Sequence, residues 1–217
     1  MAAPELDERG RGLDRVVNFS DAVFAIAITL LVLNLKVPHL TGRNVDHRLL
    51  DALGHDAGLL AGFVISFFVI ARYWMSHHRL SILLRRVDTP FIVLNLLFLA
   101  FIVFVPFPTE VIGVYGGTTT AAVFYAATMV PTGLLSWATW EYALRSGLDD
   151  GRAPAGTLRQ ARLRSGYLVT VFAISIPVAF ADPAAAQVMW ALLVLQNRFA
   201  IRFSGVAPPT PARRTRA

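Results

Sequence analysis

The stretch from Arg15 to Lys36 is long and apolar enough to cross a membrane, yet it carries Asp21 in its first third. A helix rises about 1.5 Å per residue, so about 20 residues cross a hydrocarbon core of about 30 Å. A carboxylate inside hydrocarbon costs about 3 kcal/mol on insertion scales. Asp21 therefore needs either a polar partner or a functional role.

The composition of the whole chain is that of an integral membrane protein. Of its 217 residues, 55% are hydrophobic and 16% are charged, against about 45–50% and about 25% in ordinary soluble domains. The chain has no cysteine, which excludes disulfides, thiolate chemistry and thiolate-bound metals. The net charge of +6 comes from short basic runs between apolar stretches. That distribution indicates membrane topology, and we expect no nucleic-acid partner.

Membrane-length apolar stretches recur along the chain, and they predict an all-α protein with six transmembrane helices per subunit. The predicted spans are 16–37, 57–78, 89–112, 118–144, 163–181 and 184–203. The last two meet at Ala181-Asp182-Pro183, a turn signal that ends one helix and starts the next. We therefore expect a tight helical hairpin there.

Basic residues predict the orientation of the spans. Most arginines flank the predicted spans on one side: Arg9, Arg11, Arg15, Arg79, Arg85, Arg86, Arg145, Arg152, Arg159, Arg162, Arg164, Arg198, Arg202, Arg213, Arg214 and Arg216. The positive-inside rule then places both termini in the cytoplasm. The expected division is a cytoplasmic N-terminal segment (1–15), a six-helix transmembrane domain (16–203) and a disordered cytoplasmic tail (204–217), whose arginines lie near anionic lipid headgroups.

The loop at 38–56 contains a short apolar pattern. Leu49, Leu50 and Leu53 share one face of a possible helix. Such a helix would lie in the membrane interface with its leucines toward the lipid.

Several polar residues are expected at the depth of Asp21. With a cytoplasmic N-terminus, Asp21 lies about 8 Å inside the membrane edge. The antiparallel second helix brings Arg72, Trp74 and His77 to a similar depth, and a network with any of them would satisfy the carboxylate. Arg15 lies about 120° from Asp21 around the helix, so in an assembly one of the two could reach another subunit.

A helical wheel isolates a second feature of the first span. Ile26, Leu30 and Leu33 form one stripe that excludes Asp21, and Thr29 flanks it. Such a stripe commonly faces lipid or neighbouring helices. A branched aliphatic stripe can also close a pore by dewetting. The pattern alone leaves both interpretations open.

Other chemistry finds little support in the sequence. His77 and His78 point about 100° apart on a helix and no second cluster complements them, so we expect no metal site. The motifs of membrane proteases, serine hydrolases and phosphate-binding loops are absent, and we expect no enzyme activity. Pro106 and Pro108 break a predicted span, as do discontinuous helices in transporters, although prolines also occur in membrane helices for packing reasons.

Three elements of the sequence resemble the transmembrane protein 175 family of potassium channels, found in bacteria and in endolysosomal membranes. The first is Arg15-x-x-x-Phe19-Ser20-Asp21, followed by Ala-Ile-Ala-Ile-Thr-Leu-Leu. The second is Tyr73-Trp74-Met-Ser-His77-His78-Arg79-Leu, and the third is Asn95-Leu-Leu-Phe-Leu with Pro106-Phe107-Pro108-Thr109. The resemblance covers roughly the first 110 residues.

The resemblance implies a function and roles for particular residues. In this family the first helix lines the pore, and its constriction is a ring of aliphatic side chains at the positions of Ile26, Leu30 and Leu33. A threonine at the position of Thr29 is linked with selectivity in bacterial members. The matching packing network near the cytoplasmic end comprises Arg15, Phe19, Ser20, Asp21, Trp74 and His77.

The resemblance also implies how the subunits assemble. Single-repeat chains of the family are tetramers, and this chain has one Phe-Ser-Asp. We therefore expect a homotetramer in the bacterial inner membrane, surrounded by lipid, that passes potassium without a cofactor and with modest selectivity over sodium. Two alternatives stay open. One is a proton-coupled transporter or exchanger that uses Asp21 and His77 as a relay; the other is a non-conducting scaffold.

Overall fold

The computed structural model describes residues 3–35, 37–38, 44–55 and 57–195, and these residues form helices without any strand. The helices are α1 (Ala3–Leu30), the 3-10 helix η1 (Leu31–Asn34), α2 (Val45–His55), α3 (Ala57–Leu83), α4 (Thr89–Phe104), α5 (Pro106–Tyr115), α6 (Thr119–Arg145), α7 (Thr157–Ala181), α8 (Pro183–Met189) and the 3-10 helix η2 (Trp190–Leu195). The prediction of an all-α protein is confirmed for these residues.

Five segments are long and apolar enough to cross a membrane: Gly12–Asn34, Ala57–Leu83, Thr89–Tyr115, Thr119–Arg145 and Thr157–Ala181. They correspond to the first five predicted spans. Of the sixth, predicted at 184–203, the described part is a shorter apolar helix at Pro183–Leu193. Residues 196–203 and the predicted tail at 204–217 lie outside the described residues, so the sixth span and the tail remain predictions.

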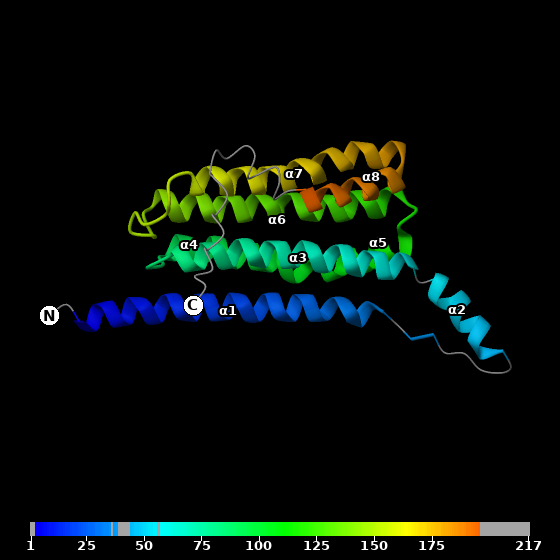
Figure 1. Cartoon of the computed structure of the whole chain (residues 1–217), viewed down its shortest axis with the longest axis horizontal. Coiled ribbons are helices and arrows are strands. Elements are labelled where there is room, and N and C mark those ends of the chain that lie inside the picture. Colours follow the sequence, from blue (N-terminus) through cyan, green and yellow to red (C-terminus); the bar gives the residue numbers. More distant parts are fainter. Residues whose placement is uncertain (1–2, 36, 39–43, 56, 196–217) are drawn as a thin grey trace, which may run out of the picture.

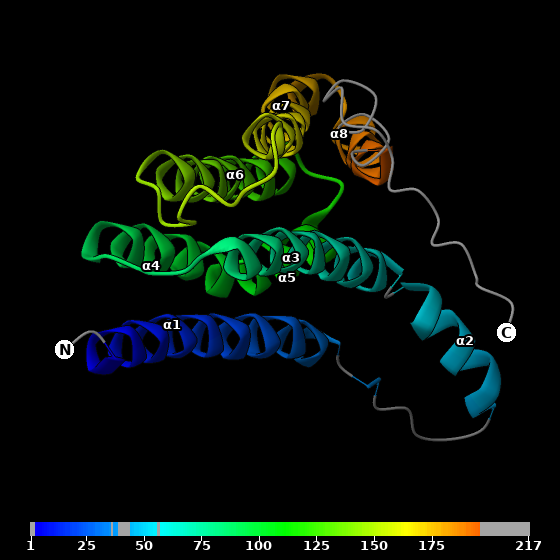
Figure 2. The same cartoon turned by 60° about the vertical axis from the view of Figure 1, so that its left-hand side comes forward.

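The long helices are arranged in three layers (Figure 1). α3, α4 and α5 lie between α1 on one side and α6, α7 and α8 on the other, and a view turned by 60° shows the same order (Figure 2). The main apolar core lies between these layers and includes the buried side chains of Phe24, Phe98, Tyr125 and Phe172. α1 is therefore an outer helix of the protomer.

The first helix begins earlier than expected. The predicted span starts at residue 16, whereas α1 already begins at Ala3. At its other end α1 tightens into η1, and Asn34 Nδ2 donates to the carbonyl of Pro106 at 3.1 Å.

The third span is broken within its length. α4 ends at Phe104 and α5 begins at Pro106, with Val105 between them. Proline has no backbone N–H and its ring clashes with the preceding turn, so the break falls where the sequence predicted one. In contrast, α6 and α7 continue through Pro131 and Pro177.

Close backbone contact joins α5 to α3. A side chain at Gly113 would come within 2.7 Å of the Leu59 side chain, and one at Gly58 within 2.8 Å of the Gly113 carbonyl. Gly62, one turn after Gly58, is buried against the same helix. Small residues spaced four apart let membrane helices approach in this way.

The predicted hairpin at Ala181-Asp182-Pro183 is confirmed. α7 ends at Ala181 and α8 begins at Pro183. The carboxylate of Asp182 accepts from the backbone N–H of Ala184 at 2.8 Å and so caps α8. Trp190 follows α8, stacks on Tyr125 with 4.6 Å between ring centroids, and donates to Ser175 Oγ at 3.1 Å.

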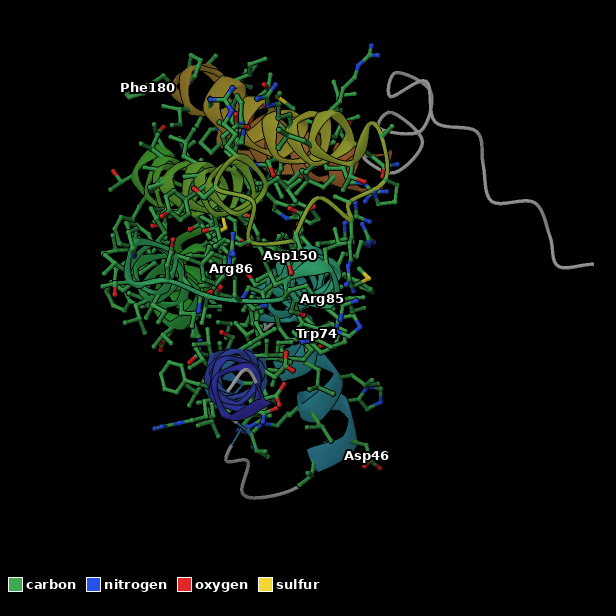
Figure 3. All side chains as sticks on the ribbon, turned by 90° about the vertical axis from the view of Figure 1, so that its left-hand side faces the viewer. Asp46, Trp74, Arg85, Arg86, Asp150 and Phe180 are labelled. Carbon is green, nitrogen blue, oxygen red and sulfur yellow. The ribbon has the colours of Figure 1, made fainter. Side chains whose placement is uncertain are left out.

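The α3–α4 and α6–α7 connections lie at the same end of the bundle as the start of α1 (Figure 1). Two contacts join these connections. Arg86 forms an ion pair with Asp150 at 3.8 Å, and Figure 3 labels both residues. The backbone N–H of Arg85 donates to the carbonyl of Leu148 at 2.8 Å. This end of the bundle is strongly basic, because the two connections and the helix ends beside them carry Arg79, Arg85, Arg86, Arg145 and Arg152. The cytoplasmic location of that end remains a prediction from the positive-inside rule.

The expected helix in the first loop is present as α2. Leu49, Leu50 and Leu53 are exposed on it. An amphipathic helix with exposed leucines is compatible with the predicted interfacial position, and its contact with lipid remains a prediction.

Candidate functional site

The candidate site is α1 with its continuation η1, and the two faces of this helix differ sharply in burial. Ser20, Phe24, Ala27 and Leu31 recur at helical spacing, and each is at most 1% exposed. They pack against α3 and α4, so this face fixes α1 to the rest of the protomer.

The aliphatic stripe lies on another face of the same helix. Ile26 is 56% exposed and Leu33 69%, while Leu30 is partly buried. Thr29 is exposed beside them, and its hydroxyl donates to the carbonyl of Ile26 at 2.9 Å. Exposed aliphatic side chains at this spacing form a surface that is suited to lipid, to other helices or to a pore.

Asp21 has a partner on the neighbouring helix. The indole N–H of Trp74 donates to the carboxylate, with 2.9 Å between Nε1 and Oδ1. Trp74 was one of three expected partners. Its ring also stacks on His78, with 5.3 Å between centroids, and Trp74 is 37% exposed.

A second set of hydrogen bonds, the buried polar network of Ser20, His77 and Asn95, links three helices. Asn95 of α4 accepts from His77 Nε2 at 2.9 Å and donates to Ser20 Oγ at 2.9 Å. Ser20 in turn donates to the carbonyl of Val16 at 2.8 Å. His77, Asn95 and Ser20 are all buried. These hydrogen bonds therefore join α1, α3 and α4, while His77 Nδ1 is buried without a hydrogen-bond partner among the described residues.

Of the three expected partners of Asp21, Trp74 is hydrogen-bonded to it, whereas His77 is hydrogen-bonded to Asn95. Asn95 was not among the predicted site residues, although a polar amide in the apolar segment 89–112 is a signal for an interhelical hydrogen bond. Arg15 and Phe19 are exposed on the protomer. Their part in a packing network remains a prediction that concerns the assembly.

The described residues contain no group of three or more His, Asp or Glu side chains placed to hold a metal ion. His77 is turned inward to Asn95, whereas the neighbouring His78 lies on Trp74. The arrangement of α1 thus combines a buried face, which packs on α3 and α4, with an exposed aliphatic face.

Comparison with known proteins gives the family context. Residues 15–106 match the family model described as endosomal/lysosomal potassium channel TMEM175. A potassium channel of Streptomyces collinus is 36% identical over 190 residues, which cover 85% of this chain and 91% of that protein. A potassium channel of Chamaesiphon minutus is 34% identical over 189 residues, with coverage of 81% and 88%.

Solved structures agree with these matches. The crystal structure of a lysosomal potassium-selective channel TMEM175 homolog from Chamaesiphon minutus has a TM-score of 0.69 and 29% identity, and the match covers 89% of this chain and 98% of that one. A variant of the potassium channel MtTMEM175 shares the fold, with a TM-score of 0.60 and 20% identity. The sequence and the fold together place this chain in the TMEM175 family.

Proposed function

We propose that this chain forms a potassium channel whose pore is lined by α1. The observation that carries the proposal is the exposed aliphatic stripe on a helix that is otherwise anchored by buried residues. The relatives that match most of this chain support it, because they are named potassium channels. A monomer cannot surround a pore with one outer helix, so several copies must contribute their α1 helices.

In the proposed assembly, four chains place α1 around a central path. Ile26, Leu30 and Leu33 of each copy form successive rings that strip part of the hydration shell from the ion and limit flow by dewetting. Thr29 adds a hydroxyl next to these rings and contributes to a modest preference for potassium over sodium. Phe19 and Arg15 lie on exposed parts of α1, where another copy can reach them.

The topology of the proposed channel follows the sequence prediction. Each subunit has a transmembrane domain at 16–203 with six spans, an N-terminal segment at 1–15 and a C-terminal tail at 204–217. Both termini are cytoplasmic, and the protein resides in the bacterial inner membrane. Its ligand is the permeating ion, and its partners are copies of itself and lipids.

The test is potassium flux into or out of proteoliposomes that contain the purified chain. We expect an outward potassium gradient to drive proton-coupled dye uptake, a weaker response with sodium, and a full response on addition of valinomycin. No flux in vesicles that still respond to valinomycin would contradict a constitutively conducting channel. Cross-linking of the same sample should stop at four copies.

A proton-coupled transporter is the alternative function, and the hydrogen bonds of His77 are relevant to it. His77 is hydrogen-bonded to Asn95, so the Asp21–His77 pair needed for a direct relay is not formed among the described residues. Saturable, pH-coupled flux without unitary currents would nevertheless favour the transporter. Unitary currents would favour the channel.

A further inference from the structure

Three arginines from two helices face one shallow groove between α3, α6 and α7. Arg72 and Arg79 come from α3, and Arg164 comes from α7. The other residues that line the groove are Tyr73, Met75, Ser76, Ser136, Ser165 and Leu168. No Asp or Glu occurs among these lining residues, so the groove concentrates positive charge and hydroxyl groups.

The three positive charges act on one another. Arg79 repels Arg72, and both repel Arg164, while the surrounding helices partly remove all three from water. Electrostatic interactions strengthen as water is excluded. An anion placed among the three guanidinium groups would therefore be attracted by each of them at once.

The neighbouring arginines at the same end of the bundle form ion pairs with carboxylates. Arg162 and Arg145 both form ion pairs with Glu141 of α6. Arg86 reaches Asp150 in the α6–α7 connection. Helix α7 thus directs Arg162 to a carboxylate and, two residues later, Arg164 to the groove. Glu141 and Asp150, the acidic partners of these neighbouring arginines, do not line the groove.

The arginines that line the groove lie within side-chain reach of the lipid headgroups. α3 has 27 residues, which span about 40 Å and exceed the hydrocarbon core of about 30 Å. Arg79 lies four residues before the end of α3, about 6 Å along the axis, and Arg164 lies about 10 Å inside the start of α7. Arg72 is deeper, but its long side chain can extend toward the interface.

We propose that this groove binds the phosphate of an anionic phospholipid. The guanidinium groups of Arg72, Arg79 and Arg164 would hold the phosphate oxygens, because their planar donors match phosphate geometry. Basic pockets between transmembrane helices recognise lipid headgroups in this way. A lipid reaches the groove by lateral diffusion in the membrane, while its acyl chains stay against the apolar helix surface. This site is separate from α1 and does not rest on the proposed channel function.

The test measures phospholipid binding to the purified full chain by native mass spectrometry. Phosphatidylglycerol and phosphatidylcholine with the same acyl chains are titrated against the wild type, the groove variant R79Q/R164Q and the control variant R85Q/R152Q. The control removes two exposed arginines of the same end that do not line the groove. Circular dichroism and gel filtration verify that each variant is folded.

We expect the wild type to prefer phosphatidylglycerol. Each groove arginine should contribute roughly fivefold to the affinity, so R79Q/R164Q should lose roughly 25-fold. The control should retain the wild-type affinity, and phosphatidylcholine binding should not change. If the double variant does not fold, Arg79→Gln and Arg164→Gln are measured singly, each with a loss of roughly fivefold expected.

Four results would overturn the proposal. The first is a wild type that binds both lipids equally, and the second is an equal loss in the groove and control variants. The third is displacement of phosphatidylglycerol by an equal concentration of inorganic phosphate, which would identify a free anion as the ligand. Wild-type affinity in both single variants would also contradict it.

Discussion

Trp74 donates its indole N–H to the carboxylate of Asp21, with 2.9 Å between Nε1 and Oδ1. This bond fastens α1 to α3 and provides a partner for a carboxylate within an apolar segment. Below it, Asn95 connects Ser20 to His77. α1 is therefore held by polar bonds on one side, while Ile26 and Leu33 remain exposed on another.

The Asp21–Trp74 bond should appear as a coupling energy between the two residues. In a double-mutant cycle with Asp21→Ala and Trp74→Phe, we expect about 1 kcal/mol of coupling in thermal unfolding in detergent. Asp21→Asn keeps the acceptor oxygen and should retain most of the coupling to Trp74. Additive effects of the two substitutions would show that the bond does not contribute to stability.

Substitution of Asn95 should lower stability more than substitution of Ser20 or His77, its partners in the buried polar network. Asn95→Leu leaves His77 and Ser20 without their shared partner, and we expect a loss of about 1–3 kcal/mol in stability. The triple variant S20A/H77F/N95L removes the stranded polar groups and should recover part of that loss, because Phe24 and Phe98 already pack on the His77 ring. A triple variant as unstable as Asn95→Leu alone would contradict this explanation.

Two glycines in helices should respond in opposite ways to alanine. Gly113→Ala places a methyl group within 2.7 Å of the Leu59 side chain, and overpacking should cost about 1–3 kcal/mol. Gly166 of α7 has no atom within 4 Å of the added methyl group, so Gly166→Ala should stabilise the chain by about 0.5–1 kcal/mol. Thermal unfolding of both variants checks the sign as well as the size.

Trp190 should anchor the segment that follows α7. Its ring is 3% exposed and stacks on Tyr125, so Trp190→Ala should cost about 3–5 kcal/mol. Leu192, two residues later, is 43% exposed, and Leu192→Ala should cost about 0.5 kcal/mol or less. Similar losses in both variants would show that Trp190 does not anchor this segment.

The sequence was sufficient to predict features that depend on local patterns. Apolar length gave the five long spans, and Asp182-Pro183 gave the hairpin, because a carboxylate cap and a proline at the first turn define a helix start. The matching depth of Asp21 and Trp74 followed from the antiparallel order of the first two spans. Each of these predictions needed only helix geometry and membrane thickness.

Features that depend on three-dimensional packing were harder to predict. The relative depths of residues on the first two spans could not identify Asn95, which lies on the third span, as the partner of His77. The approach of Gly113 to Leu59 depends on how α5 is placed after the break at Val105. The groove of Arg72 and Arg164 likewise joins residues that are distant in sequence.

The central claim is that potassium ions pass along the Ile26 stripe of α1. We would record currents from the wild type, Ile26→Asn and Ile174→Asn in planar bilayers under opposing potassium and sodium gradients. Ile174 of α7 is a matched control, since it is 50% exposed against 56% for Ile26. We predict that Ile26→Asn, folded as the wild type is, raises conductance and lowers the preference for potassium, because a polar ring is wetted more easily. Ile174→Asn should leave both unchanged. Wild-type conductance and selectivity in Ile26→Asn would contradict the account.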